Sequence, residues 1–178
     1  MKKYFIIAMI FAFYFLVLNP FPSLVMSSMN SSPQKYAIGD NLTIKLPPTS
    51  KVTEDYFGDR SELLLSYYFN DENHLFRGYI QLWQLNDLED FLVKSKSHST
   101  FDFMSHSLKP IQVVGLNGFI DKWTASFGDL LYISGIEYWL KEPQGTRILR
   151  ISFFTDRTSF SDTQLQEVDN ILSSILWE

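Results

Sequence analysis

The sequence contains no cysteine. This absence excludes disulfide bonds, thiolate catalysis and zinc sites built on thiolates. It also excludes the lipid anchor of bacterial lipoproteins, because that lipid is attached to a cysteine. The absence is compatible with an exported protein that does not depend on oxidative folding, but it does not by itself locate the protein.

Clustered basic residues are also missing. The 178 residues include 15 Lys and Arg against 20 Asp and Glu, and the formal net charge is −5. Without Lys2 and Lys3, which lie in the N-terminal apolar segment, 13 basic residues remain and the charge is −7. Nucleic-acid binding usually needs clustered Lys and Arg, and adsorption to anionic lipid needs a basic patch. We therefore expect no nucleic-acid partner.

Apolar residues are abundant. Hydrophobic residues make up 46% of the chain and aromatic residues 16%, which is enough to build a core and argues against disorder. Tyrosine and phenylalanine fit pleated, half-buried surfaces and favour a sheet-rich fold. The length suggests one domain after any leader is set aside.

The sequence opens with MKKYFIIAMIFAFYFLVLNPFPSLVMSSMN, in which two lysines precede an uncharged apolar run over residues 4–18. This layout is typical of a secretory signal. As a helix the run would span about 22 Å, less than the ~30 Å hydrocarbon core. Val25 and Ser27 allow cleavage after Ser27, whereas the apolar stretch read through to Met26 is long enough for an anchor. We expect residues 1–27 to be a signal peptide or an N-terminal membrane anchor, forming an apolar leader helix, with the remaining chain outside the cytoplasm.

Residues 28–35 are rich in Ser, Asn and Pro and predict a linker, so we expect a globular domain over residues 36–178. LTIKLPP alternates apolar and polar residues and predicts a half-buried strand. ELLLSYYFNDENHLFRGYIQLWQL predicts two long strands joined by a turn at Asn70–Asn73.

Two helices are expected in the domain. In NDLEDFLVKSKS, Asn86 is a candidate N-cap with Glu89 three residues later. In FSDTQLQEVDNILSSILW, Ser161 and Gln164 form a capping box, and Phe160 can pack onto Leu165. An apolar stripe follows on this helix, made of Leu165, Val168, Leu172, Ile175 and Leu176.

Antiparallel strands are expected between the two helices. Gly115 and Gly118 flank a predicted tight turn between a short strand and a longer one. DLLYISGIEYWL and TRILRISFF are two further strands, separated by the turn sequence KEPQG. The order of strand, hairpin, helix, several strands and helix predicts an α+β fold, an antiparallel β-sheet flanked by helices.

Four segments in this order carry a family resemblance: LTIKLPP, LNDLEDFLVKS, VVGLNGFIDKW and a closing Phe before the terminal helix. Together they resemble PsbP-like domains, which are named after an extrinsic subunit of photosystem II, over residues 36–177. The chain departs from the family in having PPTSKV where members often carry a Gly-Trp pair. The resemblance implies an α/β/α sandwich and a non-enzymatic role that supports a larger assembly at a membrane.

The segment HSTFDFMSH holds the candidate metal ligands His98, Asp102 and His106. On a continuous helix their spacing would align two imidazoles and a carboxylate, which suit zinc or another divalent metal. The Ser and Thr residues between them favour a solvated loop instead. Ser105 next to His106 can be read as a nucleophile and its base, but neighbouring side chains point apart on a strand. We expect a loop here, no catalytic residue and no cofactor.

Two further groups have alternative interpretations. The acidic residues Glu54, Asp55, Asp59 and Glu62 suit a cation, although their spacing matches no known calcium loop and favours a solvated charged loop. The tryptophans, which are Trp83, Trp123, Trp139 and Trp177, are expected mostly in the core, or else lining a cleft for an apolar ligand.

The sequence therefore supports three functional hypotheses. The first is a non-catalytic, extracytoplasmic interaction or assembly domain with an unknown protein partner, secreted or held at the plasma membrane by its N-terminal segment. The second is a domain that binds a small ligand or lipid. The third is a metal-dependent hydrolase built on His98, Asp102 and His106.

Overall fold

The structure is a computed structural model that describes residues 32–55, 62–128 and 131–178. The predicted signal peptide or anchor over residues 1–27 lies outside the described residues. The chain divides into two compact units, of which the second comprises residues 31–86 and 101–178. In the described part of the chain, no helix is both long and apolar enough to cross a membrane.

The described part of the first unit contains one helix, α2 (Leu88–Ser97). Its N-cap is Asp87, whose carboxylate accepts a hydrogen bond from the backbone N–H of Asp90. The prediction of Asn86 as the cap is therefore wrong by one residue. Both side chains are good caps, and the aspartate adds a negative charge at the positive end of the helix dipole.

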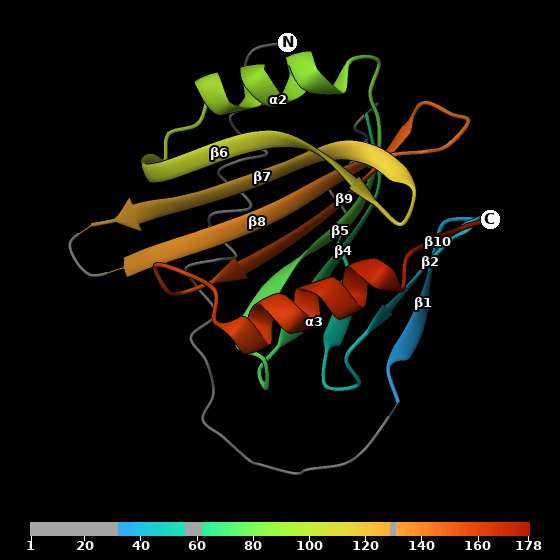
Figure 1. Ribbon diagram of the computed structural model, residues 1–178, viewed down its shortest axis with the longest axis horizontal. Coiled ribbons are helices and arrows are strands. Elements are labelled where there is room, and N and C mark those ends of the chain that lie inside the picture. The colour runs from blue at the N-terminus through green and yellow to red at the C-terminus, as the bar shows by residue number, and fades with distance from the viewer. Residues whose placement is uncertain (1–31, 56–61, 129–130) are drawn as a thin grey trace. The chain divides into compact units, whose positions relative to one another are not determined.

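Two antiparallel sheets and one helix form the described part of the second unit (Figure 1). In the small sheet, β2 (Leu42–Leu46) lies between β1 (Gln34–Ile38) and β10 (Leu176–Trp177). The strands of the large sheet are β3 (Lys51–Glu54), β4 (Leu63–Asp71), β5 (Phe76–Gln84), β6 (Asp102–Val113), β7 (Leu116–Phe127), β8 (Leu131–Lys141) and β9 (Arg147–Thr155). Their order is β3-β4-β5-β9-β8-β7-β6.

The core lies between the large sheet, the small sheet and α3 (Asp162–Ser173). Strand alternation directs Leu149, Ile151 and Phe153 of β9 to one face, as predicted, and all three are fully buried. The small sheet contributes Leu42 and Ile44 to the same cluster. In the view of Figure 1, α3 lies below β8 and passes in front of β4 and β5, so the ribbons of β6, β7 and β8 stay uncovered.

The predicted terminal helix is confirmed, but its buried face differs from the predicted apolar stripe. Ser161 caps α3, and the reciprocal capping box with Gln164 is present. The predicted stripe is wrong at its ends, because Leu165 is 37% exposed and Leu176 is 50% exposed. Ile171 is buried instead. It lies three residues after Val168 and four before Ile175, so the three side chains share the face that packs on the core.

The predicted strands LTIKL, LLLSYYF and FRGYIQLWQ correspond to β2, β4 and β5 and are confirmed. Three short strands, β1, β3 and β10, were not predicted, and β1 begins at Gln34, inside the segment expected to be a linker. Short edge strands have little periodicity of their own. They form because a neighbouring strand offers unpaired backbone groups.

Two predictions around β6 and β7 are wrong. The segment expected to be a solvated loop is strand from Asp102 onwards, where a register shift between Phe103 and Ser105 obscures the alternation in the sequence. Gly118 does not flank the turn but lies inside β7, opposite Ile111. A Cβ at Gly118 would lie 1.9 Å from the carbonyl oxygen of Trp139, so this glycine permits a close approach of two strands.

The described residues are therefore mostly antiparallel sheet with two helices, which the class α+β fits in outline. One helix, α3, packs on one face of the large sheet. The sandwich with helices on both faces stays a prediction.

Candidate functional site: an open groove beside helix α3

An open groove of about 340 Å³ lies where β6, β7 and β8 meet the chain segment that leads into α3. We call it the α3 groove. Its lining residues are Ser105, His106, Ser107, Lys122, Trp123, Thr124, Ser134, Gly135, Ile136, Thr158, Ser159, Phe160 and Leu165. It belongs entirely to the second unit.

Strand register decides which side chains face the groove. Ser107 lies opposite Lys122, and Ser105 lies opposite Thr124. On the other side of β7, Thr124 lies opposite Ser134. Because alternate residues of paired strands share a face, these hydroxyl groups and one ammonium group gather on the face that also carries α3. The floor of the groove is rich in hydroxyl groups.

Two of the hydroxyl groups also hold the wall of the groove in place. Ser134 Oγ donates to the carbonyl oxygen of Arg157 at 2.8 Å, and Thr124 Oγ1 lies 3.0 Å from Ser134 Oγ. Thr124 Oγ1 also donates to the carbonyl oxygen of Thr158 at 3.4 Å. These bonds fix the segment between β9 and α3 against the sheet.

The wall is apolar and the charge in the groove is positive. Phe160 precedes the N-cap of α3 and Leu165 lies in its first turn, and both line the groove. Lys122 is exposed, and none of the ion pairs found among the described residues involves it. The groove can therefore accept hydrogen-bonding groups, a negative charge and an apolar side chain.

The imidazole of His106 belongs to the other face of the sheet. His106 lies opposite Trp123 in the register, and its Nε2 is 2.8 Å from Oδ1 of Asp121. The side chains of Ser105 and His106 therefore point apart, as expected for neighbours on a strand. Asp102 accepts a hydrogen bond from Ser126 Oγ at 3.2 Å, so the three residues do not form a nucleophile, base and orienter.

The candidate metal ligands occupy different elements. His98 is the C-cap of α2, with Nδ1 2.7 Å from the carbonyl oxygen of Lys94, whereas Asp102 and His106 lie on β6. Within the described ranges there is no group of three or more His, Cys, Asp or Glu residues that could hold a metal ion. The helix that would have aligned the three residues does not extend past His98.

The acidic segment is described only in part. Glu54 ends β3 and Glu62 precedes β4, while Asp59 lies outside the described residues. Burial raises the pKa of the Asp55 carboxyl. Asp55 donates its backbone N–H to the carbonyl oxygen of Ser66 at 2.8 Å, which continues the pairing of β3 with β4.

A polar network that sequence reasoning missed lies on the sheet face opposite α3. Arg150 Nε donates to Oε2 of Glu137 at 2.8 Å, and its Nη1 donates to Oε1 of Gln81 at 2.8 Å. Trp123 Nε1 donates to the other oxygen of Glu137 at 2.9 Å. The guanidinium also lies 5.0 Å from the ring centre of Trp139. The alternation of Arg150 and Ser152 with the buried residues of β9 was the only signal for this layer.

The tryptophans were expected mostly in the core, and two of the four are buried. Trp123 and Trp139 are buried, while Trp83 and Trp177 are half-buried. Trp123 lines the α3 groove, although its indole N–H is bonded to Glu137 on the opposite face of the sheet.

No protein-family model matches the sequence, and the comparison with curated proteins finds no match. Among solved structures, the chain is similar to the solution structure of cyanobacterial PsbP (CyanoP) from Synechocystis sp. PCC 6803. The TM-score is 0.55 at 13% sequence identity, and the similarity covers 90% of this chain and 100% of that chain. The fold is therefore PsbP-like, which confirms the resemblance seen in the order of the elements.

Proposed function

We propose that this protein is a non-catalytic, extracytoplasmic interaction domain that binds a segment of a partner protein in the α3 groove. The N-terminal residues 1–27 would export the domain and then be removed or hold it at the plasma membrane. The positively charged start and apolar run of that segment support export.

The chemistry of the groove carries this proposal. Its hydroxyl groups and Lys122 can bind polar groups of a protein segment, and Phe160 and Leu165 can contact an apolar side chain. The imidazole of His106 is paired with Asp121 on the opposite face. The imidazole that could act as a base toward the hydroxyl groups of the groove is therefore directed away from them, which supports a binding role.

The openness of the groove favours a protein segment over an enclosed ligand. Small-molecule sites bury most of their ligand, whereas this site lies between a strand surface and the first turn of α3. Interfaces typically combine apolar anchors with a polar rim, which is the composition found here. The PsbP-like fold adds support, because the family resemblance implies a non-enzymatic role in a larger assembly.

Site-specific photo-crosslinking in native membranes tests the proposal. A photoreactive phenylalanine analogue replaces Leu165 in the full chain, and the matched control carries it at Gln166, the next residue on α3 and also exposed. We expect a discrete adduct from position 165 and none from position 166. Equal patterns at both positions, or no adduct at either, would contradict groove binding.

A small-ligand or lipid-binding function is the second candidate, because the volume of about 340 Å³ is sufficient for a small molecule. Native mass spectrometry of the full chain would detect a co-purified ligand. Replacing Leu165 with Trp narrows the groove and should remove such a mass, whereas the same change at Gln166 should not.

A further inference from the structure

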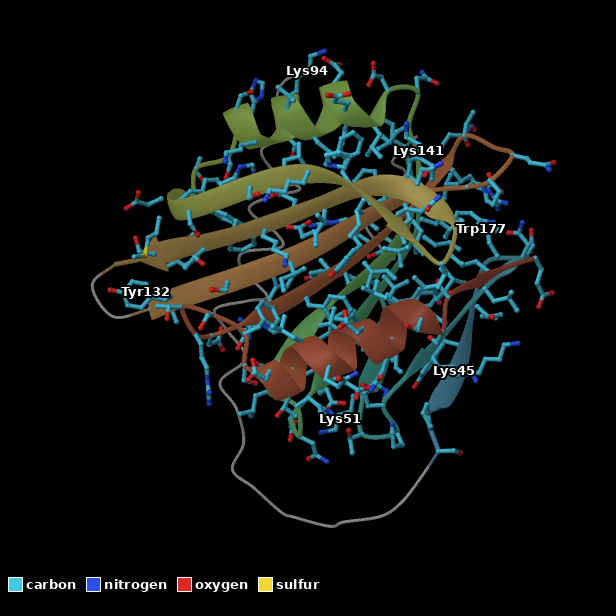
Figure 2. All side chains as sticks on the ribbon, viewed as in Figure 1. Lys45, Lys51, Lys94, Tyr132, Lys141 and Trp177 are labelled. Atoms are coloured by element: carbon cyan, nitrogen blue, oxygen red, sulfur yellow. The ribbon has the colours of Figure 1, made fainter. Side chains whose placement is uncertain are left out.

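The exposed face of the small sheet carries two lysines directly opposite each other. Lys35 of β1 pairs with Lys45 of β2 in the antiparallel register. Leu42, Ile44 and Leu46 of β2 point into the core, so Lys45 lies on the outer face, and both lysines are exposed. Figure 2 shows Lys45 on this sheet, to the right of α3.

This pair is not neutralised within the described chain. None of the ion pairs among the described residues involves Lys35 or Lys45. The acidic residues that belong to this sheet lie at its other end, where Asp40 precedes Asn41 and the backbone N–H of Glu178 donates to the carbonyl oxygen of Asn41 at 2.8 Å. Like charges directly opposite each other destabilise an antiparallel pair.

Protection of a sheet edge accounts for only one of the two lysines. Lysines on edge strands block pairing with other chains, which gives Lys35 on β1 a structural reason. Lys45 lies on β2, which pairs with β1 on one side. On the other side β10 reaches only Leu42 and Thr43, and Ser174 Oγ bonds both the backbone N–H and the carbonyl oxygen of Lys45, so the edge is already covered there. Edge protection therefore offers no reason for a second lysine at that position.

An apolar row lies beside the lysine pair. Thr43 of β2 lies opposite Ala37 of β1 and opposite Leu176 of β10. Leu176 is the first residue of β10 and is 50% exposed. The outer face of the small sheet thus combines a positive pair with an exposed apolar side chain within two residues along β2.

We propose that this outer face, formed by Lys35, Ala37, Thr43, Lys45 and Leu176, docks an acidic segment of a partner protein. Carboxylates of that segment lie between the two ammonium groups, and an apolar side chain covers Leu176. The inference rests on the proposed function, because it names the chemistry of the partner, but it concerns a surface other than the α3 groove.

Charge complementarity favours an acidic protein segment over an anionic membrane. Each lysine near an anionic bilayer contributes about 1 kcal/mol, so two lysines hold a protein only weakly. The chain as a whole carries −5 and is repelled by such a surface. A short acidic segment can place its carboxylates next to the lysines, and it is too small to be repelled by the rest of the negatively charged chain as a whole membrane surface is.

Fluorescence anisotropy with a labelled peptide of alternating Glu and Leu residues tests the docking face in the full chain, held in a zwitterionic detergent. We expect Lys35→Glu and Lys45→Glu each to weaken peptide binding about tenfold, and added salt to weaken it as well. The control is Lys141→Glu, which changes another exposed strand lysine, labelled in Figure 2, and should leave the affinity unchanged.

The thermal stability of the same variants supplies a second readout. Lys45→Glu converts a like-charge pair into an opposite-charge pair, so the midpoint of unfolding should rise by about 1–3 °C while binding falls. A lower midpoint would overturn the inference, since it would show that the lysines stabilise the free protein. Unchanged affinity in both lysine variants, or no binding of the peptide at all, would also overturn it.

Binding to vesicles of phosphatidylcholine with about a third phosphatidylglycerol tests whether anionic lipid occupies the face instead. Lysine-dependent binding to these vesicles without binding to the peptide would assign the face to lipid and overturn the inference. An adduct from position 165, together with peptide binding that does not depend on the lysines, would leave groove binding intact while the docking face fails. No adduct from position 165, together with lysine-dependent peptide binding, would mean that groove binding fails while the docking face stands.

Discussion

The side-chain amide of Gln164 on α3 donates a 2.8 Å hydrogen bond to the main-chain carbonyl oxygen of Leu75, in the turn between β4 and β5. The same Nε2 lies 3.0 Å from the carbonyl oxygen of His74. On its other side, Gln164 Oε1 accepts the backbone N–H of Ser161 at 2.8 Å and so completes the capping box. One buried amide therefore joins the start of a helix to a distant hairpin turn.

We predict that Gln164→Ala destabilises the protein more than loss of the cap alone. The substitution removes the capping bond and also the bonds from Nε2 to the carbonyl oxygens of His74 and Leu75, which together should cost about 2–3 kcal/mol. Ser161→Ala removes only the cap and should cost about 1 kcal/mol. Urea denaturation of the full chain measures both. Gln166→Ala on the exposed side of α3 is the control, and equal losses for Gln164 and Ser161 would contradict the second role.

Substitutions at the two central residues of the turn between β6 and β7 should change stability in opposite directions. Val114 and Gly115 are its two central residues, with φ of 45° and 84°. A turn with two positive φ angles favours Asn-Gly, and a β-branched residue there is strained. Val114→Asn should therefore stabilise the protein by about 1 kcal/mol.

The matched change at the second position should act in the other direction. A Cβ at Gly115 would meet no atom within 4 Å, so Gly115→Ala tests backbone conformation without a steric clash. We expect a loss of about 1–2 kcal/mol. Thermal unfolding of both variants measures the effects, and a loss in the Val114→Asn variant would show that the valine makes contacts that outweigh its strain.

Local signals in the sequence predicted local structure. Ser161 and Gln164 lie three residues apart, so their capping box could be read directly from the chain. The bond from Gln164 to Leu75 could not be predicted, because the two residues are separated by 89 positions and nothing in the sequence links them. The same limit applies to the network around Arg150, whose partners come from β5 and β8.

The candidate site was missed for a related reason. Ser105 and Ser107 looked like loop residues, since a register shift interrupts the alternation of β6. The groove that they line also requires β7, β8 and the segment before α3, which meet only through sheet pairing. The docking face depends on the pairing of Lys35 with Lys45, and Lys35 was assigned to a linker.

The carboxyl of Asp71 should contribute to the loss of stability at low pH. Burial alone would raise the pKa of its carboxyl, but hydrogen bonds from the His74 backbone, Thr49 and Ser50, together with the charge of His74, outweigh burial and lower the pKa. The folded state therefore binds the proton less tightly than the unfolded state. The stabilisation is present above the unfolded pKa of about 3.9 and is lost as the pH falls through the lower folded value.

We accordingly expect Asp71→Asn to reduce stability at neutral pH and to flatten the loss of stability below about pH 4. Asp90→Asn is the control for removal of a charge, because the Asp90 side chain is 52% exposed. Urea denaturation across the acid range would measure the slopes. If the Asp71→Asn variant keeps the slope of the unaltered protein, another carboxyl is responsible.

The pair formed by Glu137 and Arg150 should show strong energetic coupling. Their side chains are 10% and 20% exposed, and Arg150 Nη2 lies 2.6 Å from Glu137 Oε2. Arg150→Met would leave the carboxylate largely buried, with Trp123 as a donor, and should cost about 3 kcal/mol. Glu137→Gln should cost less, because the neutral amide needs no counter-charge. The double variant should be more stable than the sum of the two losses predicts, since it leaves no unpaired charge. A double-mutant cycle by urea denaturation measures the coupling, and simple additivity would show that solvent already screens the pair.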